Sequence, residues 1–234
     1  MVVLIPSYEP DDALVEVVVG LRAALPQAEV LVVDDGSGPA YASVYRAAAD
    51  AGATVVGYER NRGKGAALKS GFRWVIEHRP GEVVVCADSD GQHRVGDIVR
   101  VANAVRPGRM LVIGGRRFTG AVPLRSQVGN TATRHLFQMV TGLGLHDTQS
   151  GLRGYPYELL DWLLTIPGER FEYELSMLLA AAADGVEVKE IEIATVYDPH
   201  AYSSHFRTFV DSWRVYQPLL RYGLTRQGPR SDAG

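Results

Sequence analysis

Two aspartates one residue apart, Asp88 and Asp90, follow the apolar run Val83–Cys86 in the stretch EVVVCADSDGQH at 82–93. Two carboxylates that face the same point repel each other, and one of them stays protonated unless a cation lies between them. Oxygen ligands favour Mg²⁺ or Mn²⁺, and Mg²⁺ in proteins usually also binds phosphate oxygens of a substrate. Gln92 adds a neutral carbonyl oxygen two residues after Asp90. The pattern therefore predicts a divalent-cation site that binds a phosphate-bearing molecule.

Charged clusters follow four of the five apolar runs in the first half of the chain. The clusters are Asp34 with Asp35, Arg60 to Lys64, Asp88 to Asp90, and Arg116 with Arg117. Open α/β sheets bind their ligands at the carboxyl ends of parallel strands. These clusters therefore predict one binding site along a single rim of a sheet.

The elements that would position these clusters alternate between strands and helices. Apolar runs predict strands at 2–5, 29–38 with its terminal turn, 53–57, 82–87 and 109–115, and apolar side chains at helical spacing predict helices at 11–25, 40–51, 65–77 and 95–105. This alternation is typical of βαβ units, and continuous apolar runs are typical of strands covered on both faces. We expect an α/β fold with a mostly parallel sheet flanked by helices and a less regular second half. The predicted domain spans 1–222 and a polar tail spans 223–234.

The composition argues against several classes of protein. The net charge of −3 over 234 residues disfavours a nucleic-acid partner. The one cysteine, Cys86, cannot form an intramolecular disulfide, and we expect it to be buried and reduced, as in cytosolic proteins. No apolar stretch approaches the roughly 20 residues of a membrane-spanning helix. The N-terminus also lacks the basic start of a secretory signal, so we expect a cytoplasmic protein.

Two common nucleotide-binding motifs are absent. Gly65 and Ala66 follow Lys64, where a P-loop needs serine or threonine, and no G-x-G-x-x-G follows the first predicted strand. A P-loop ATPase and a nicotinamide-dependent enzyme are therefore disfavoured.

Several segments together resemble one family of enzymes. The segments VVLIPSYEP, LVVDDGSG, NRGKGAALKSGF and VVVCADSDGQH resemble, in this order and spacing, family 2 glycosyltransferases of the GT-A fold. Four downstream segments resemble the branch that glycosylates dolichyl or polyprenyl phosphate: GGRRF, GNTATRHLFQMVTGLGLHDTQSGLRGY, FEYELSMLLAAAADGVEVKEIEI and HAYSSHFRTFVDSWRVYQPLLRYG. The resemblance implies a metal-dependent, inverting transfer of a hexose from a nucleotide sugar, of the GDP-mannose or UDP-glucose type, to a polyprenyl phosphate.

The resemblance also implies roles for individual residues. Asp88 and Asp90 match the family's metal-binding D-x-D, with Gln92 as a third ligand of Mg²⁺ or Mn²⁺, and Asp34 with Asp35 match the pair that recognises base and ribose. The other residues implied in donor binding are Pro6, Tyr8, Glu9, Lys64 and Ser89. In this chain a glutamate stands at position 9, where the family usually has asparagine, and a serine at position 89, where alanine is common.

The acceptor side of the site is expected in the second half of the chain. A lipid monophosphate is already an anion at neutral pH, so it needs positioning and charge balance, which arginines supply. The arginines available there are Arg116, Arg117, Arg125, Arg134 and Arg153. By resemblance, Arg117 and Arg134 are the leading phosphate-binding candidates, and His205 with Arg207 are candidates to close over the donor diphosphate. The candidate catalytic residues are Asp90, Asp147, Arg117 and Arg134.

The C-terminal stretch 206–222 predicts an amphipathic helix. One stripe holds Phe209, Trp213, Tyr216 and Leu220, and the adjacent stripe holds Arg207, Arg214 and Arg221. Such a helix suits a membrane interface, and it equally suits a terminal helix that packs on its own domain. A polyprenyl-phosphate acceptor would place the enzyme at the inner face of the plasma membrane, through peripheral contact or a membrane partner.

Two alternatives keep the same fold. A soluble or glycan hydroxyl acceptor would need a general base, for which Asp147 in the segment DTQSG is the obvious candidate. A sugar-nucleotide-binding module without catalysis would keep the cation site and lack transfer.

Overall fold

A seven-stranded sheet forms the centre of the computed structural model, which describes residues 1–116, 134–193, 219 and 222. Its strands are β1 (Val2–Ser7), β2 (Glu29–Asp34), β3 (Thr54–Gly57), β4 (Val84–Cys86), β5 (Met110–Arg116), β6 (Arg153–Tyr155) and β7 (Glu187–Ile193). They are ordered β3-β2-β1-β4-β6-β5-β7. Strand β6 is antiparallel to both β4 and β5, and every other pairing is parallel. The prediction of a mostly parallel sheet is confirmed.

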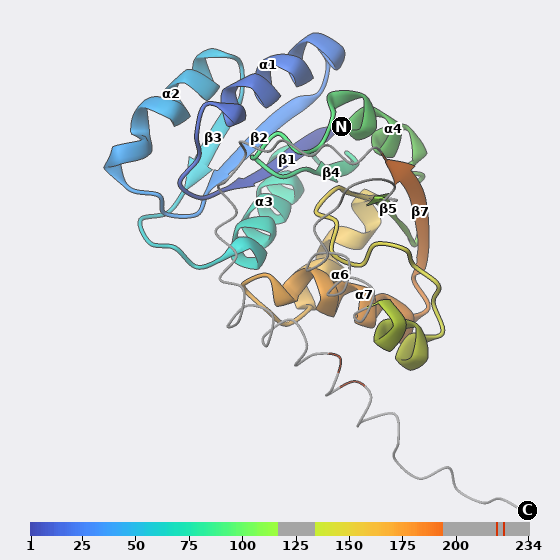
Figure 1. The fold of residues 1–234 in the computed structure, drawn as a ribbon. Helices are drawn as coiled ribbons and strands as arrows, with labels where there is room; N and C mark the ends of the chain where they lie inside the picture. Colours follow the sequence, from blue (N-terminus) through green and yellow to red (C-terminus); the bar gives the residue numbers. More distant parts are fainter. Residues whose placement is uncertain (117–133, 194–218, 220–221, 223–234) are drawn as a thin grey trace, which may run out of the picture.

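Helices cover both faces of this sheet, as Figure 1 shows. The described helices are α1 (Ala13–Ala24), α2 (Ala42–Asp50), α3 (Lys64–His78), α4 (Val95–Ala104), α6 (Leu160–Thr165), α7 (Glu172–Asp184), a helical segment at 134–141, and the short 3₁₀ turns η1 (Pro39–Tyr41) and η2 (Tyr157–Leu159). All four helices predicted in the first half are present, with bounds that differ by a few residues at most.

Each face of the sheet carries its own buried core, because successive strand residues point to opposite faces. Val3 and Ile5 of β1 pack with α1, α2 and α4, whereas Val2 and Leu4 pack with α3, α6 and α7. The single cysteine, Cys86, is buried in the second core, as predicted. The two cores hold the sheet between two helical layers, so its carboxyl rim has a rigid base.

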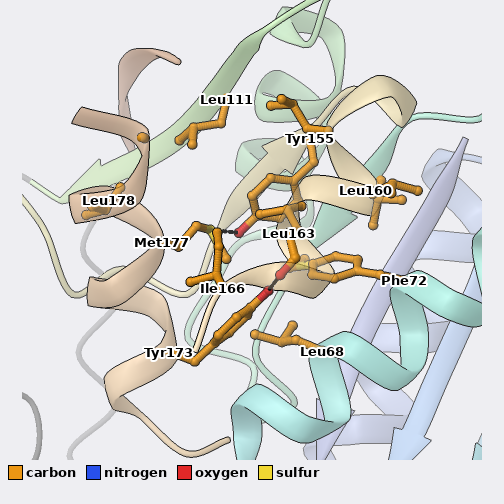
Figure 2. Close-up of a cluster of buried hydrophobic side chains, with 14 of the residues drawn as sticks. Leu68, Phe72, Leu111, Tyr155, Leu160, Leu163, Ile166, Tyr173, Met177 and Leu178 are labelled. Atoms are coloured by element: carbon orange, nitrogen blue, oxygen red, sulfur yellow. Dashed lines mark hydrogen bonds between the residues drawn. The ribbon is translucent and has the colours of Figure 1, made fainter. Parts of the chain in front are cut away.

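Helix α7 is anchored deep in the second core (Figure 2). The hydroxyl of Tyr173 donates a 2.7 Å hydrogen bond to the carbonyl of Leu163 in α6, and the hydroxyl of Tyr155 lies 3.1 Å from Met177 Sδ. Phe72 of α3 packs edge-on against Tyr155, with ring centroids 5.4 Å apart. These contacts fix α7 relative to α3 and β6, a constraint that matters for the charged groups described below.

Helix α3 lies close to β1 because its sequence has a glycine at the point of contact. A Cβ added at Gly71 would overlap the side chain of Leu4, which is fully buried. We expect Gly71→Ala to lower the free energy of unfolding by about 1–2 kcal/mol, since overpacking costs more than the helix propensity that alanine gains. Urea denaturation measures this loss. Gly96→Ala in α4 is the matched control, because its Cβ would meet nothing within 4 Å, and it should be neutral or stabilising.

Most of the predicted C-terminal helix and the polar tail lie outside the described residues. Within that stretch, Leu219 is buried in the second core and Tyr222 packs against it. Across the described part of the chain, none of the helices has both the length and the apolar character needed to cross a membrane.

Candidate active site

The described residues of the predicted charged clusters lie along one rim of the sheet. Strands β1, β2, β4 and β5 run in the same direction, so their carboxyl ends lie along one rim. Lys64, the first residue of α3, reaches across this rim to Asp88 beyond β4. The structure thus brings together residues that the sequence separates by more than twenty positions.

The carboxylate of Asp88 has a basic partner on each oxygen. Lys64 Nζ lies 2.7 Å from Asp88 Oδ1, and His93 Nε2 lies 3.2 Å from Oδ2. Burial alone would raise the pKa of Asp88, but the ammonium of Lys64 and the His93 ring together hold it well below its ordinary value. Gly151 makes room for this carboxylate, because an added Cβ there would overlap it. Asp88 is therefore an anion in a fixed position.

The fixed negative charge of Asp88 makes ionisation of the neighbouring Asp90 less favourable. Burial and the neighbouring charge of Asp88 raise the pKa of Asp90 above its ordinary value. Its Oδ1 accepts one hydrogen bond, 3.0 Å long, from the Gln92 backbone N–H. A raised carboxyl pKa next to a second carboxylate is the conflict that a bound cation would relieve.

The donor set around this turn fits a divalent cation that shares its coordination with a ligand. Among the described residues, no three His, Cys, Asp or Glu side chains are gathered as a closed metal cage. Two carboxylates and the Gln92 amide would instead leave positions for other oxygens, which is how Mg²⁺ is usually held with substrate phosphates.

Behind Lys64 lies a buried charge network that the sequence did not reveal. Lys64 Nζ lies 3.0 Å from Glu174 Oε2, and Glu174 Oε1 lies 4.0 Å from Arg153 Nε. Arg153 is fully buried and donates to the carbonyls of Ser150, Thr148 and Glu174 at 2.9, 3.1 and 2.7 Å. Arg153 is one of the arginines considered for phosphate binding. Its described hydrogen bonds all go to groups inside the protein.

Asp35 organises the loop that leads into α3. Its buried carboxylate accepts hydrogen bonds from the backbone N–H groups of Arg62 and Gly63, the hydroxyl of Tyr58 and the amide of Asn61, at 2.5–3.1 Å. Gly63 has a φ of 107°, which favours glycine. Asp35 therefore sets the start of the helix that carries Lys64.

The remaining donor-side residues lie at the ends of β1 and β2. Asp34 is half-buried and its Oδ1 accepts from the Ser37 backbone N–H at 2.8 Å. Pro6 is buried within β1, and Tyr8 follows the strand. The Glu9 N–H donates to Ser37 Oγ at 2.8 Å, and Glu9 has a φ of 49°, in the left-handed region that is uncommon for residues other than glycine. Ser89, between the two aspartates, is half-buried.

Asp147 is buried beside the end of β5 and forms an ion pair with Arg116. Arg116 Nε donates to Asp147 Oδ2 at 2.6 Å, and the Gln149 backbone N–H donates to Oδ1 at 3.0 Å. Glu190 of β7 accepts hydrogen bonds from the backbone N–H groups of His146 and Asp147, which fixes this loop against the sheet edge. Both oxygens of the Asp147 carboxylate are thus engaged with donors of the protein.

Of the other residues predicted for this part of the site, the structure describes only Arg134. Arg134 begins the helical segment 134–141 and is partly exposed. Arg117, Arg125, His205 and Arg207 lie outside the described residues. Sequence reasoning missed His93 and Glu174 as partners of Asp88 and Lys64; the only signals were a histidine soon after the aspartate pair and a glutamate on a mostly apolar helix.

The chain is similar in sequence to known glycosyltransferases. The family model described as Glycosyl transferase family 2 matches residues 2–162. The chain is 32% identical to polyprenol monophosphomannose synthase of Mycolicibacterium smegmatis, over 82% of this chain and 75% of that protein. It is also 32% identical to undecaprenyl-phosphate mannosyltransferase of Micrococcus luteus, over 82% of each chain.

Solved structures share the fold. Glucosyl-3-phosphoglycerate synthase from Mycobacterium tuberculosis, in complex with Mn²⁺, UDP and glucosyl-3-phosphoglycerate, matches with a TM-score of 0.72 at 21% identity, over 100% of this chain and 82% of that one. The mannosyltransferase PcManGT from Pyrobaculum calidifontis, in complex with GDP-Man and Mn²⁺, matches with a TM-score of 0.61 at 19% identity, over 97% and 64%.

Proposed function

Because the chain belongs to glycosyl transferase family 2 and has the GT-A fold, we propose that it moves a hexose from a nucleotide sugar to the phosphate of a polyprenyl phosphate. Two relatives at 32% identity are named for polyprenol monophosphomannose synthesis and for undecaprenyl-phosphate mannosyl transfer, which supports this acceptor. The donor is of the GDP-mannose or UDP-glucose type. Structural neighbours crystallised with Mn²⁺ and UDP or GDP-Man support a divalent cation as cofactor.

The engaged carboxylate of Asp147 is the observation that carries the choice of acceptor. A hydroxyl acceptor needs a general base within hydrogen-bond reach of its proton. Asp147, the candidate base, is fully buried and its oxygens accept from Arg116 and Gln149. A phosphate monoester needs no such base, because it is already an anion at neutral pH. The described site therefore suits a phosphate acceptor better than a hydroxyl.

In the proposed reaction, an oxygen of the acceptor phosphate bonds to the anomeric carbon as the bond from that carbon to the donor diphosphate breaks. The nucleoside diphosphate leaves with the electron pair, and the configuration at the anomeric carbon inverts. A cation held by Asp88, Asp90 and Gln92 would neutralise the charge that develops on the leaving group. Lys64, 2.7 Å from Asp88, places a further positive charge at the same end of the site.

Transfer into lipid tests this proposal directly. Purified protein is incubated with radiolabelled GDP-mannose, UDP-glucose or UDP-GlcNAc, polyprenyl phosphate and Mn²⁺ or Mg²⁺, and label is counted in the organic extract. We expect one donor to label the lipid, and EDTA to abolish the labelling. Donor binding without transfer to the lipid or to any hydroxyl acceptor would favour a sugar-nucleotide-binding module instead.

Asp147→Asn separates a phosphate acceptor from a hydroxyl acceptor. If Asp147 positions Arg116 and is no base, we expect less than about a tenfold fall in the maximal transfer rate, with a higher KM for polyprenyl phosphate. Loss of a general base costs about 10²- to 10⁴-fold. Initial rates at several acceptor concentrations measure both parameters. A fall of about a thousandfold in a folded variant would favour the hydroxyl alternative.

We also propose that the protein meets its lipid acceptor by peripheral contact at a membrane surface, on the cytoplasmic side. The relatives named for polyprenyl and undecaprenyl phosphates support this, since their acceptor is a membrane lipid. Co-sedimentation with vesicles that contain polyprenyl phosphate would measure the contact, and vesicles without that lipid are the control.

A further inference from the structure

Four side chains of alternating charge lead from the protein interior to the rim of the site. Arg153 of β6 approaches Glu174 of α7 at 4.0 Å, Glu174 approaches Lys64 at 3.0 Å, and Lys64 approaches Asp88 at 2.7 Å. Arg153 is fully buried, and the side chains of Glu174 and Lys64 are only 10% and 17% exposed. The network thus connects a residue deep in the fold with a proposed cation ligand.

Glu174 has little freedom to move within this network. Its helix is anchored by two nearby residues of α7: Tyr173 donates a hydrogen bond to the Leu163 carbonyl, and Met177 Sδ accepts one from the Tyr155 hydroxyl (Figure 2). Its backbone carbonyl accepts a 2.7 Å hydrogen bond from Arg153 Nη1. The carboxylate of Glu174 therefore extends from an anchored helix and places a negative charge 3.0 Å from Lys64 Nζ.

Lys64 divides its ammonium between two carboxylates. An ammonium has three N–H donors, and here two of its contacts go to Glu174 and Asp88 at similar distances. With Glu174 removed, Asp88 would become the one carboxylate in contact with Lys64 among the described residues, and the ammonium would neutralise it more completely. A neutralised Asp88 attracts a divalent cation less, since the attraction follows the local charge.

We propose that Glu174 is a positioning residue that shares the ammonium of Lys64 with Asp88, so that Asp88 is less completely neutralised and keeps its ability to bind the cation. The inference rests on the proposed function, because that function supplies the cation. Glu174 touches neither donor nor acceptor in this role and acts through Lys64.

A double-mutant cycle on Mn²⁺ binding tests this, with no sugar transfer in the readout. The dissociation constant for Mn²⁺ alone is measured by electron paramagnetic resonance for wild type, Glu174→Gln, Lys64→Met and the double variant. We expect Glu174→Gln to weaken Mn²⁺ binding about tenfold, as a change of one nearby charge does, and Lys64→Met to strengthen it. We expect the double variant to bind as Lys64→Met does, because Glu174 has lost the group through which it acts.

Asp184→Asn is the matched control: it removes a carboxylate at the far end of the same helix, where Asp184 accepts from Trp162, and should leave Mn²⁺ binding unchanged. Thermal melts establish that each variant is folded. If Glu174→Gln does not fold, comparison of the double variant with Lys64→Met still decides, since a difference between them contradicts the proposal.

Two outcomes would overturn the role of Glu174 and leave the proposed function intact. Unchanged Mn²⁺ affinity in Glu174→Gln would show that the carboxylate has no influence on the cation site. An equal weakening with and without Lys64 would show that Glu174 acts by its own field and not through the lysine. A wild-type protein that binds no Mn²⁺ would instead contradict the cation site of the proposed function itself.

Discussion

Asp88→Asn is expected to lower the rate of sugar transfer by at least about a hundredfold while the fold stays intact. The amide has nearly the shape of the carboxylate, so it fits the space beside Gly151, but it removes the anion that Lys64, His93 and the proposed cation share. Removing one electrostatic contact to a developing charge commonly costs 10²–10³ in rate. Transfer of label into lipid and a thermal melt measure the two properties separately.

Asp50→Asn is a suitable control for this variant, because Asp50 ends α2 and is exposed. It should transfer sugar at the wild-type rate. Excess Mn²⁺ should restore Asp88→Asn only in part, since the lost group also pairs with Lys64. Near-normal transfer by Asp88→Asn at low Mn²⁺ would contradict the assignment of the aspartate turn as the cation site.

Arg153→Met is expected to give the largest loss of stability, about 3–5 kcal/mol in the free energy of unfolding. Removing one partner of a buried ion pair leaves an uncompensated charge, and such losses fall in this range. Here the loss also leaves the backbone carbonyls of Ser150, Thr148 and Glu174 without their buried donor. Methionine fills a similar volume, so the loss reports the missing charge and hydrogen bonds. Urea denaturation measures it.

Arg153→Lys provides the comparison for this second prediction. Lysine keeps the charge but lacks the planar fork that serves several carbonyls at once, so we expect an intermediate loss of stability. A loss below about 1 kcal/mol for Arg153→Met would mean that the surrounding carbonyls find other donors.

The first half of the fold was predictable from the sequence because its strands are continuous apolar runs between amphipathic helices. Strand β6 was not, since Arg153–Tyr155 is three residues long and carries a buried arginine and a glycine. Its position between β4 and β5 depends on pairing with segments far away in the chain, which periodicity does not report.

The candidate site was also predictable only in part. Asp88, Asp90 and Lys64 follow or begin elements with clear patterns, and a parallel sheet brings such ends together. The binding of Asp35 to backbone N–H groups of the following loop, and the enclosure of Asp147, depend on the course of the backbone in three dimensions. Residue type alone does not distinguish a carboxylate that binds a ligand from one that binds the chain itself.

The antiparallel strand β6, inserted between β4 and β5, has a consequence for how the protein is made. Strands β1 to β4 are complete by residue 86, yet in the described sheet β5 joins them through β6, which begins at Arg153, well after β5 ends at Arg116. Until then a nascent chain carries an unpaired edge on β4, the kind of edge that recruits other chains. We therefore expect translation products that stop near residue 116 to aggregate.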